Sequence, residues 1–181
     1  MRRGIYHSIV VLSILVAVGC STAPKSAGDK VALHAKVEDA ISQAREKDSS
    51  LEKFFDTAAG YAVFPTVGKG AIGVGGAYGR GEVYENGTVV GYCTLTQASI
   101  GLQLGGQAYT EMIFFETPEA LKRFQSGNFA FSAQASAVAL KAGVGANAKY
   151  ENAVAVFTMS EAGLMYEASI GGQKFNYEPK M

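Results

Sequence analysis

The sequence predicts an α+β domain in which strands dominate, with a glycine-rich antiparallel sheet or sheets, N-terminal amphipathic helices and one inserted helix. Apolar residues recur at helical spacing before residue 57 and alternate with a period of two after residue 60. The 181 residues include 22 glycines without a collagen period, which we assign to turns, bulges and closely approached strands. With 48% hydrophobic and 18% charged residues, the chain is expected to fold.

The first predicted helix begins at Asp29, from which apolar residues fall three and four positions apart. They are Leu33, Val37, Ala40, Ile41 and Ala44. The segment from Asp29 to Asp56 carries more acidic than basic residues, whereas helices that lie on membranes favour a basic polar face. Packing on the domain's own core is therefore favoured, and insertion into a bilayer remains the alternative.

A second helix is predicted from Ser49 and Glu52, which have the spacing of a capping box, and Gly60 is a plausible stop for it. Asn86-Gly87 predicts a hairpin, because both residues accept the positive φ angles of a type I′ turn. A third helix is expected over 118–125, with Thr117 as its cap. The predicted strands cover 61–64, 71–83, 89–95, 99–105, 109–115, 129–140, 153–159, 164–170 and 174–177.

Residues 1–19 have the pattern of a signal peptide, with Arg2 and Arg3 before an apolar run over 9–18. That run is shorter than the about 20 residues that a spanning helix needs. It ends in Ala17-Val18-Gly19-Cys20, which is similar to a bacterial lipobox and predicts acylation of Cys20, palmitate included. An ordinary or uncleaved secretory signal is the alternative.

The predicted organisation is therefore a signal peptide over 1–19, a lipidated cysteine with a flexible tether over 20–28, and one domain over 29–181. Ser21 after the cysteine resembles the sorting pattern of Gram-negative lipoproteins of the outer membrane. We expect a lipid anchor in the outer membrane of a bacterial cell envelope, with the domain facing the periplasm.

The composition leaves little material for catalysis. The formal net charge is zero, which argues against a nucleic-acid partner. After processing, the chain would hold one thiol, Cys93, expected to be buried, and one imidazole, His34, so we predict no catalytic residues, metal site or cofactor. Residues 68–73 match the dinucleotide fingerprint G-x-G-x-x-G, but a predicted strand follows where that fingerprint requires a helix.

One acidic residue stands out, because Glu111 interrupts the apolar strand predicted over 109–115. Strand alternation would place it on the same face as Tyr109 and Ile113. It is expected either at a sheet edge or with a buried partner, and a functional carboxylate is the third alternative.

Glycine-rich blocks across residues 60–115 carry a family resemblance. Gly-Tyr-Ala-Val-Phe-Pro-x-Val-Gly-Lys-Gly, Gly-Val-Gly-Gly-Ala-Tyr-Gly-Arg-Gly and Leu-Thr-Gln-Ala-Ser-Ile-Gly-Leu-Gln-Leu-Gly-Gly-Gln-Ala-Tyr resemble the SYLF domain family. This family includes yeast Las17-binding actin regulators and many bacterial lipoproteins, and the similarity covers about residues 30–178. It implies binding of phosphoinositides and other anionic phospholipids through an amphipathic helix and basic residues, without established catalysis. Actin regulation is not carried over, because a periplasmic chain meets no actin.

The candidate lipid-binding residues are Lys69 and Arg80, each flanked by glycines that would let a lipid phosphate approach the backbone amides, together with Lys122 and Arg123. Scattered surface charge is the alternative for all four. The predicted function is a lipidated periplasmic protein that binds anionic phospholipid head groups. The alternative function is a structural or envelope-assembly protein that binds a protein partner through its glycine-rich surface.

Overall fold

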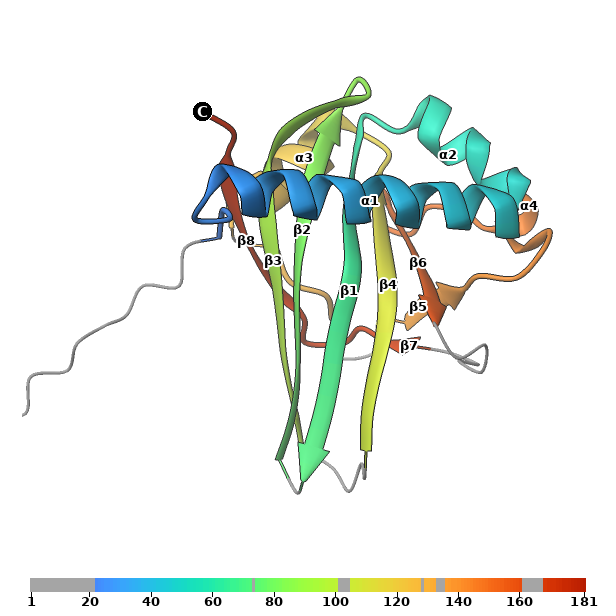
Figure 1. Ribbon diagram of the computed structural model, residues 1–181. Helices are drawn as coiled ribbons and strands as arrows, with labels where there is room; N and C mark the ends of the chain where they lie inside the picture. Colours follow the sequence, from blue (N-terminus) through green and yellow to red (C-terminus); the bar gives the residue numbers. More distant parts are fainter. Residues whose placement is uncertain (1–21, 73, 101–104, 128, 133–135, 161–167) are drawn as a thin grey trace, which may run out of the picture.

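A computed structural model describes most of the domain and leaves the predicted signal peptide and Cys20 outside the described residues (Figure 1). The described residues are 22–72, 74–100, 105–127, 129–132, 136–160 and 168–181. Strands outnumber helices, and the predicted α+β class with β dominant is confirmed.

The described strands form one sheet in the order β7-β5-β6-β4-β1-β2-β3-β8. All described pairings are antiparallel except β5 with β6, where Val138 pairs with Phe157 in parallel register. The prediction of a purely antiparallel sheet is therefore wrong at this pair, because the chain crosses back through a helical turn instead of a hairpin. The strands are β1 (Gly60–Ile72), β2 (Val74–Glu85), β3 (Thr88–Ile100), β4 (Gly105–Phe115), β5 (Ser136–Ala139), β6 (Val154–Ser160), β7 (Ala168–Ser169) and β8 (Lys174–Pro179).

Strand β1 passes through Pro65, where the sequence predicted an end. The register shifts here on both sides of β1, between Val63 and Thr66 toward β2 and between Phe64 and Val67 toward β4. A bulge of this kind accommodates a proline, which cannot donate to the ladder. The hydroxyl of Thr110 donates to the carbonyl oxygen of Pro65 at 2.9 Å and satisfies that acceptor.

The predicted hairpin between β2 and β3 is confirmed. Asn86 and Gly87 have φ angles of 50° and 71°, and Glu85 pairs with Thr88 across the turn. These positive values are those that the Asn-Gly sequence tolerates.

Helix α1 (Ala27–Lys47) lies across the sheet (Figure 1). Its buried residues are Val37, Ala40, Ile41 and Ala44, members of the predicted stripe. It begins two residues before the predicted start, because the hydroxyl of Ser26 accepts from the backbone N–H of Asp29 at 3.0 Å. Before it, Ala23 is buried and its N–H donates to Glu178 Oε2 at 3.0 Å, so part of the expected tether is packed.

The second predicted helix is a single 3-10 turn, η1 (Ser49–Leu51), followed by α2 (Glu52–Thr57). The predicted Ser49 capping box is wrong, because Asp48 is the cap. Its carboxylate accepts from the N–H groups of Ser50, Gly143 and Gly145 at 3.0, 3.1 and 2.7 Å. Asp48 thereby ties this turn to α4 (Val144–Asn147), a helix that the sequence did not predict.

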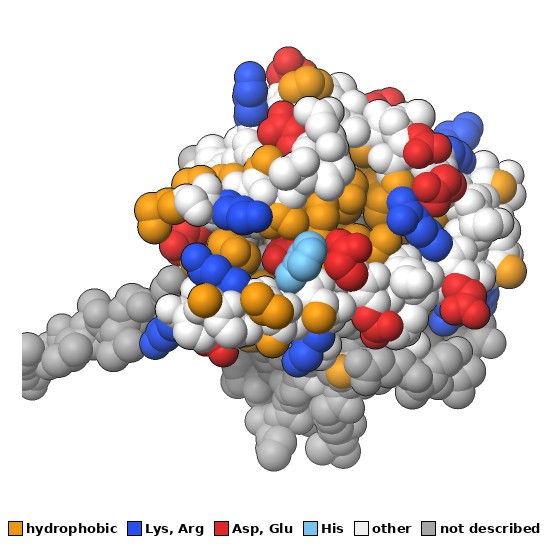
Figure 2. Space-filling view, turned by 45° about the horizontal axis from the view of Figure 1, so that its top comes forward, with side chains coloured by type: hydrophobic (Ala, Val, Ile, Leu, Met, Phe, Trp, Pro, Cys, Tyr) orange, Lys and Arg blue, Asp and Glu red, His pale blue; other side chains and the backbone are white. Residues whose placement is uncertain are grey.

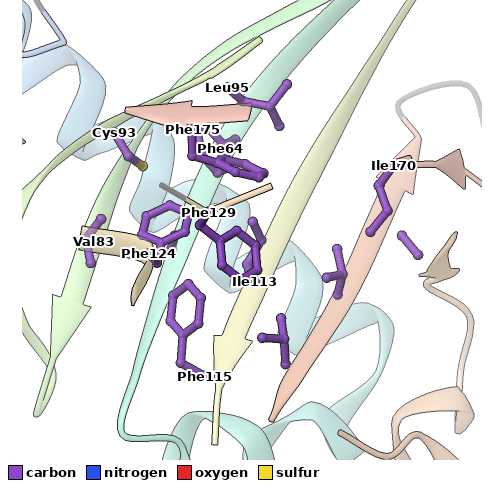
Figure 3. Close-up of a cluster of buried hydrophobic side chains, with 14 of the residues drawn as sticks. Phe64, Val83, Cys93, Leu95, Ile113, Phe115, Phe124, Phe129, Ile170 and Phe175 are labelled. Atoms are coloured by element: carbon purple, nitrogen blue, oxygen red, sulfur yellow. The ribbon is translucent and has the colours of Figure 1, made fainter. Parts of the chain in front are cut away.

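The sheet has two faces, each with its own hydrophobic core. The α1 face carries the core under α1 and α2, which includes Val37, Phe54 and Phe114. The α3 face carries the core under α3 (Pro118–Gln125) and the C-terminal segments, where the rings of Phe115, Phe124 and Phe175 pack (Figure 3). The Phe124 ring lies 4.9 Å from that of Phe115 and 5.1 Å from that of Phe175.

Helix α3 matches its prediction, with the hydroxyl of Thr117 accepting from Ala120 N–H and Pro118 in the first turn. Other late elements are shorter than predicted. The strand expected over 129–140 is confined to β5 among the described residues, and most of the one expected over 164–170 lies outside them.

Candidate functional site

The predicted cations Lys69 and Arg80 lie on opposite faces of the sheet. Lys69 pairs with Ala77 on β2, and Arg80 stands three residues beyond Ala77 on that strand. Cross-strand partners share a face, whereas residues an odd number apart on one strand point to opposite faces. Arg80 pairs with Thr66, and the register runs without interruption from Thr66 to Lys69, so the two cations lie three positions apart in one regular ladder. The two cations therefore do not form one site.

Lys122 and Arg123 lie exposed on α3. The guanidinium of Arg123 stands 5.8 Å from the centroid of the Phe129 ring, a cation–π contact on the α3 face. The structure thus distributes the predicted lipid-binding residues between the two sides of the sheet. Their role stays a prediction.

A groove of about 570 Å³ runs between α1 and the sheet. Such a volume lies in the range of small-molecule sites. One wall is a stripe of α1, and the other wall and the floor come from β1, β4 and β6. The lining residues are Lys36, Asp39, Ala40, Gln43, Glu46, Lys47, Pro65, Thr66, Thr110, Met159 and Ser160.

The Pro65 bulge shapes the floor of this groove. Pro65 and Thr66 are both lining residues, and Thr110 from the neighbouring strand completes the floor. The groove was not predicted from the sequence. The sequence shows only a polar stripe beside the apolar stripe of α1, and the opposing wall is built by three strands that are distant in sequence.

Both signs of charge line the groove. Lys36 and Lys47 supply ammonium groups, and Asp39 and Glu46 supply carboxylates. Asp39 accepts a hydrogen bond from the Gln43 amide at 2.7 Å, which orients its carboxylate without neutralising it. The surface around α1 shows the same mixture, with acidic and basic side chains interspersed (Figure 2).

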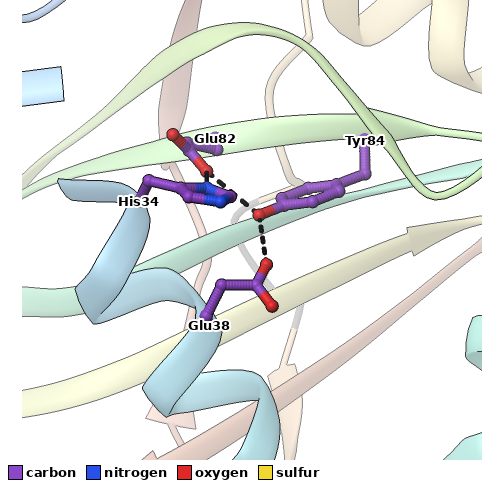
Figure 4. Close-up of polar contacts among 4 residues, drawn as sticks. All are labelled: His34, Glu38, Glu82 and Tyr84. Atoms are coloured by element: carbon purple, nitrogen blue, oxygen red, sulfur yellow. Dashed lines mark hydrogen bonds and ion pairs between the residues drawn. The ribbon is translucent and has the colours of Figure 1, made fainter. Parts of the chain in front are cut away.

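A second polar cluster joins α1 to β2 (Figure 4). His34 Nδ1 lies 2.9 Å from Glu82 Oε2, and the hydroxyl of Tyr84 lies 2.9 Å from Glu38 and 3.0 Å from Glu82. A phenol has one proton, so only one of these carboxylates accepts from Tyr84 at a time. Burial, with Glu38 and Glu82 beside the ring, raises the pKa of Tyr84. The cluster fastens α1 to the sheet.

Glu111 has a buried partner, which was one of the alternatives drawn from the sequence. It does not lie at an edge of the sheet. It is fully buried on β4, between β1 and β6, and accepts from Gln173 Nε2 at 3.0 Å. Its Oε1 has no hydrogen-bond partner among the described residues. Burial is the largest influence and raises the pKa of Glu111 to about 7, against the lowering effect of hydrogen bonds with Gln173 and Tyr109.

The remaining features considered in the sequence are the thiol of Cys93, metal-ligating side chains and membrane-spanning helices. Cys93 is buried with a free thiol, and burial raises its pKa. The part of the chain that the structure describes contains no group of three or more His, Cys, Asp or Glu residues able to hold a metal ion. In the same residues, no helix combines the length and the apolar character needed to cross a bilayer.

Comparison with known proteins gives two findings. A family model described as Ysc84, "Las17-binding protein actin regulator", matches residues 96–180. A relative from Aeromonas veronii, named Beta cell expansion factor A, is 27% identical over 154 residues. The match covers 84% of this chain and 59% of the relative, so the chain spans about three fifths of that protein's length.

Proposed function

We propose that this chain, whose residues 96–180 match the family model described as Ysc84, is a membrane-tethered protein that binds phospholipid head groups. The match overlaps the last of the three glycine-rich blocks and agrees with the resemblance drawn from them. This similarity supports a lipid-binding, non-enzymatic domain in general terms, and the kind of phospholipid, the binding residues and the envelope location are our proposals.

The groove between α1 and the sheet is the observation that carries the proposal. It holds two ammonium groups, Lys36 and Lys47, together with the hydroxyl-bearing Thr66. A phosphate accepts hydrogen bonds from both kinds of donor, and charge-assisted bonds are the stronger ones. The groove thus offers phosphate donors beside the apolar surface of Met159 and Pro65, which suits the junction between a head group and its acyl chains.

A lipid anchor on Cys20 would make a weak site effective. Tethering replaces association from solution by an intramolecular encounter, at an effective concentration that reaches millimolar for short linkers. We place the anchor in the outer membrane, with the domain in the periplasm, on the lipobox-like sequence at 17–20 and the serine that follows it.

A binding role also fits the placement of the groups that catalysis would use. The imidazole of His34 is engaged by Glu82, and the thiol of Cys93 lies inside the α3-face core. Both therefore act in the packing of the domain.

Vesicle flotation tests the proposal, with the chain from residue 20 onward carrying Cys20→Ser so that no acyl group contributes. We expect binding to phospholipid vesicles, and we expect a Lys36→Gln/Lys47→Gln variant to lose most of it. Lys69→Gln/Arg80→Gln and Lys122→Gln/Arg123→Gln variants test the positions predicted from the sequence. Absence of binding to every vesicle composition, anionic ones at low salt included, would overturn the proposal and favour a protein partner.

A further inference from the structure

We infer that the groove under α1 selects zwitterionic head groups, in which an ammonium follows a phosphate by a short linker, as in phosphatidylethanolamine. This inference rests on the proposed function and names its lipid class. The observation that carries it is the presence of carboxylates among the cations of the groove, on the same stripe of α1.

The spacing of the charges along α1 suits a head group of this kind. Lys36 and Asp39 are three residues apart, and such neighbours on a helix surface have Cβ atoms about 5–6 Å apart. A phosphate on Lys36 thus leaves a nearby ammonium within reach of Asp39. Glu46 and Lys47 supply both signs again at the other end of the groove, about 15 Å farther along the helix axis at 1.5 Å per residue.

The carboxylates are available for a ligand. Within the described residues, no salt bridge joins Lys36, Lys47 or Glu46 to another side chain. Asp39 is held by the uncharged amide of Gln43, so its negative charge is not neutralised by a neighbouring cation. A ligand ammonium would supply the missing positive charge and the hydrogen-bond donors that a carboxylate accepts.

The same carboxylates act against purely anionic head groups. Two lysines and two acids leave the groove without net charge, so it does not attract an anionic surface over distance. A phosphatidylglycerol head group would bring a phosphate to Lys36 but no cation to Asp39. Specificity often depends on such an unfavourable contact with the wrong ligand. This differs from the anionic preference that the family resemblance implies, which we placed on Lys69, Arg80, Lys122 and Arg123.

Removing the carboxylates tests the inference, because binding to the two kinds of vesicle should change in different directions. Flotation would compare phosphatidylcholine vesicles containing phosphatidylethanolamine with matched vesicles containing phosphatidylglycerol, using the Cys20→Ser chain from residue 20. We expect an Asp39→Asn/Glu46→Gln variant to bind the phosphatidylethanolamine vesicles about tenfold more weakly, at roughly threefold per exposed ion pair. The same variant should bind the phosphatidylglycerol vesicles equally well or better.

A matched control is Lys149→Gln/Glu151→Gln, which changes exposed charges outside the groove and should leave both affinities unchanged. Soluble phosphoethanolamine should compete with the phosphatidylethanolamine vesicles for the parent chain and not for the Asp39→Asn/Glu46→Gln variant. If removing the carboxylates raises binding to both kinds of vesicle, the inference is overturned and the proposed function stands. If the parent chain binds neither kind at any salt concentration, the proposed function itself fails.

Discussion

Among the described residues, each face of the sheet buries one glutamate on an interior strand, and the two glutamates have different partners. Glu82 on the α1 face has 2% of its surface exposed and contacts His34 and Tyr84. Glu111 on the α3 face is fully buried, bonds to Gln173 and Tyr109, and keeps one oxygen without a hydrogen-bond partner among the described residues.

The cover over each face explains the difference. Helix α1 crosses the sheet over Glu82, and the His34 side chain on its flank is 50% exposed while still reaching Glu82. The α3 face is closed by a cluster of aromatic rings, and the described hydrogen-bond partners of Glu111, Gln173 and Tyr109, carry no positive charge. A buried carboxylate without a cation prefers its neutral form. The elements that cover a face, and not the strand that bears the residue, therefore decide which partners a buried acid has.

Deleting one ring from each core should produce the largest effects. Phe124→Ala on the α3 face and Phe54→Ala on the α1 face each remove a fully buried ring. Each should lower the free energy of unfolding by about 3–5 kcal/mol, measured by urea denaturation. A loss below about 1 kcal/mol for either variant would show that its face is not a packed core.

Glu111→Gln should stabilise the protein above neutral pH. The pKa of Glu111 is about 7 in the folded chain against an ordinary value of 4.5. Because the folded pKa is raised, the contribution is fully present below about pH 4.5 and is lost as pH rises through 7. The loss amounts to roughly 3 kcal/mol, and Glu111→Gln should remove it from a stability profile between pH 4 and 9. A parent profile that is flat over this interval would contradict the prediction.

Asp48→Ala should destabilise the α1 face by about 2 kcal/mol, because it leaves the N–H groups of Gly143 and Gly145 without their acceptor. Burial acts to raise the pKa of Asp48, but hydrogen bonds from Ser50, Gly145 and Gly143 together lower it below its ordinary value. Its contribution is thus present above about pH 4 and is lost as pH falls. Thermal denaturation at pH 7 and pH 3 measures this, with Ser49→Ala as a control expected to change little.

Glu82→Gln should change the free energy of unfolding least among these variants. At pH 8 it should destabilise the protein, whereas Glu111→Gln should stabilise it. The amide can still accept from Tyr84, but it loses the charge that faces His34. We expect a loss of about 1 kcal/mol in urea denaturation. A stabilising Glu82→Gln would show that both faces treat a buried acid alike.

Sequence analysis succeeded where local chemistry decides the structure. The Asn86-Gly87 hairpin, the Thr117 cap and the buried stripe of α1 each follow from residues close together in the chain. It failed where distant segments meet, as at the parallel pairing of β5 with β6 and at the groove. Lys69 and Arg80 show the reason, since their glycine neighbours look alike, but the pairing of β1 with β2 places the two side chains on opposite faces.

The bond between Ala23 and Glu178 also limits how far the domain could move on a lipid anchor. With Ala23 held against the C-terminal strand, only residues 21 and 22 would separate an acylated Cys20 from the folded body. Three Cα–Cα steps of 3.8 Å span at most about 11 Å. A domain joined to its anchor by so short a linker would sample few orientations. The edge of the sheet at β8 and the first turns of α1 would then stay beside the bilayer, with the far end of the strands pointing away.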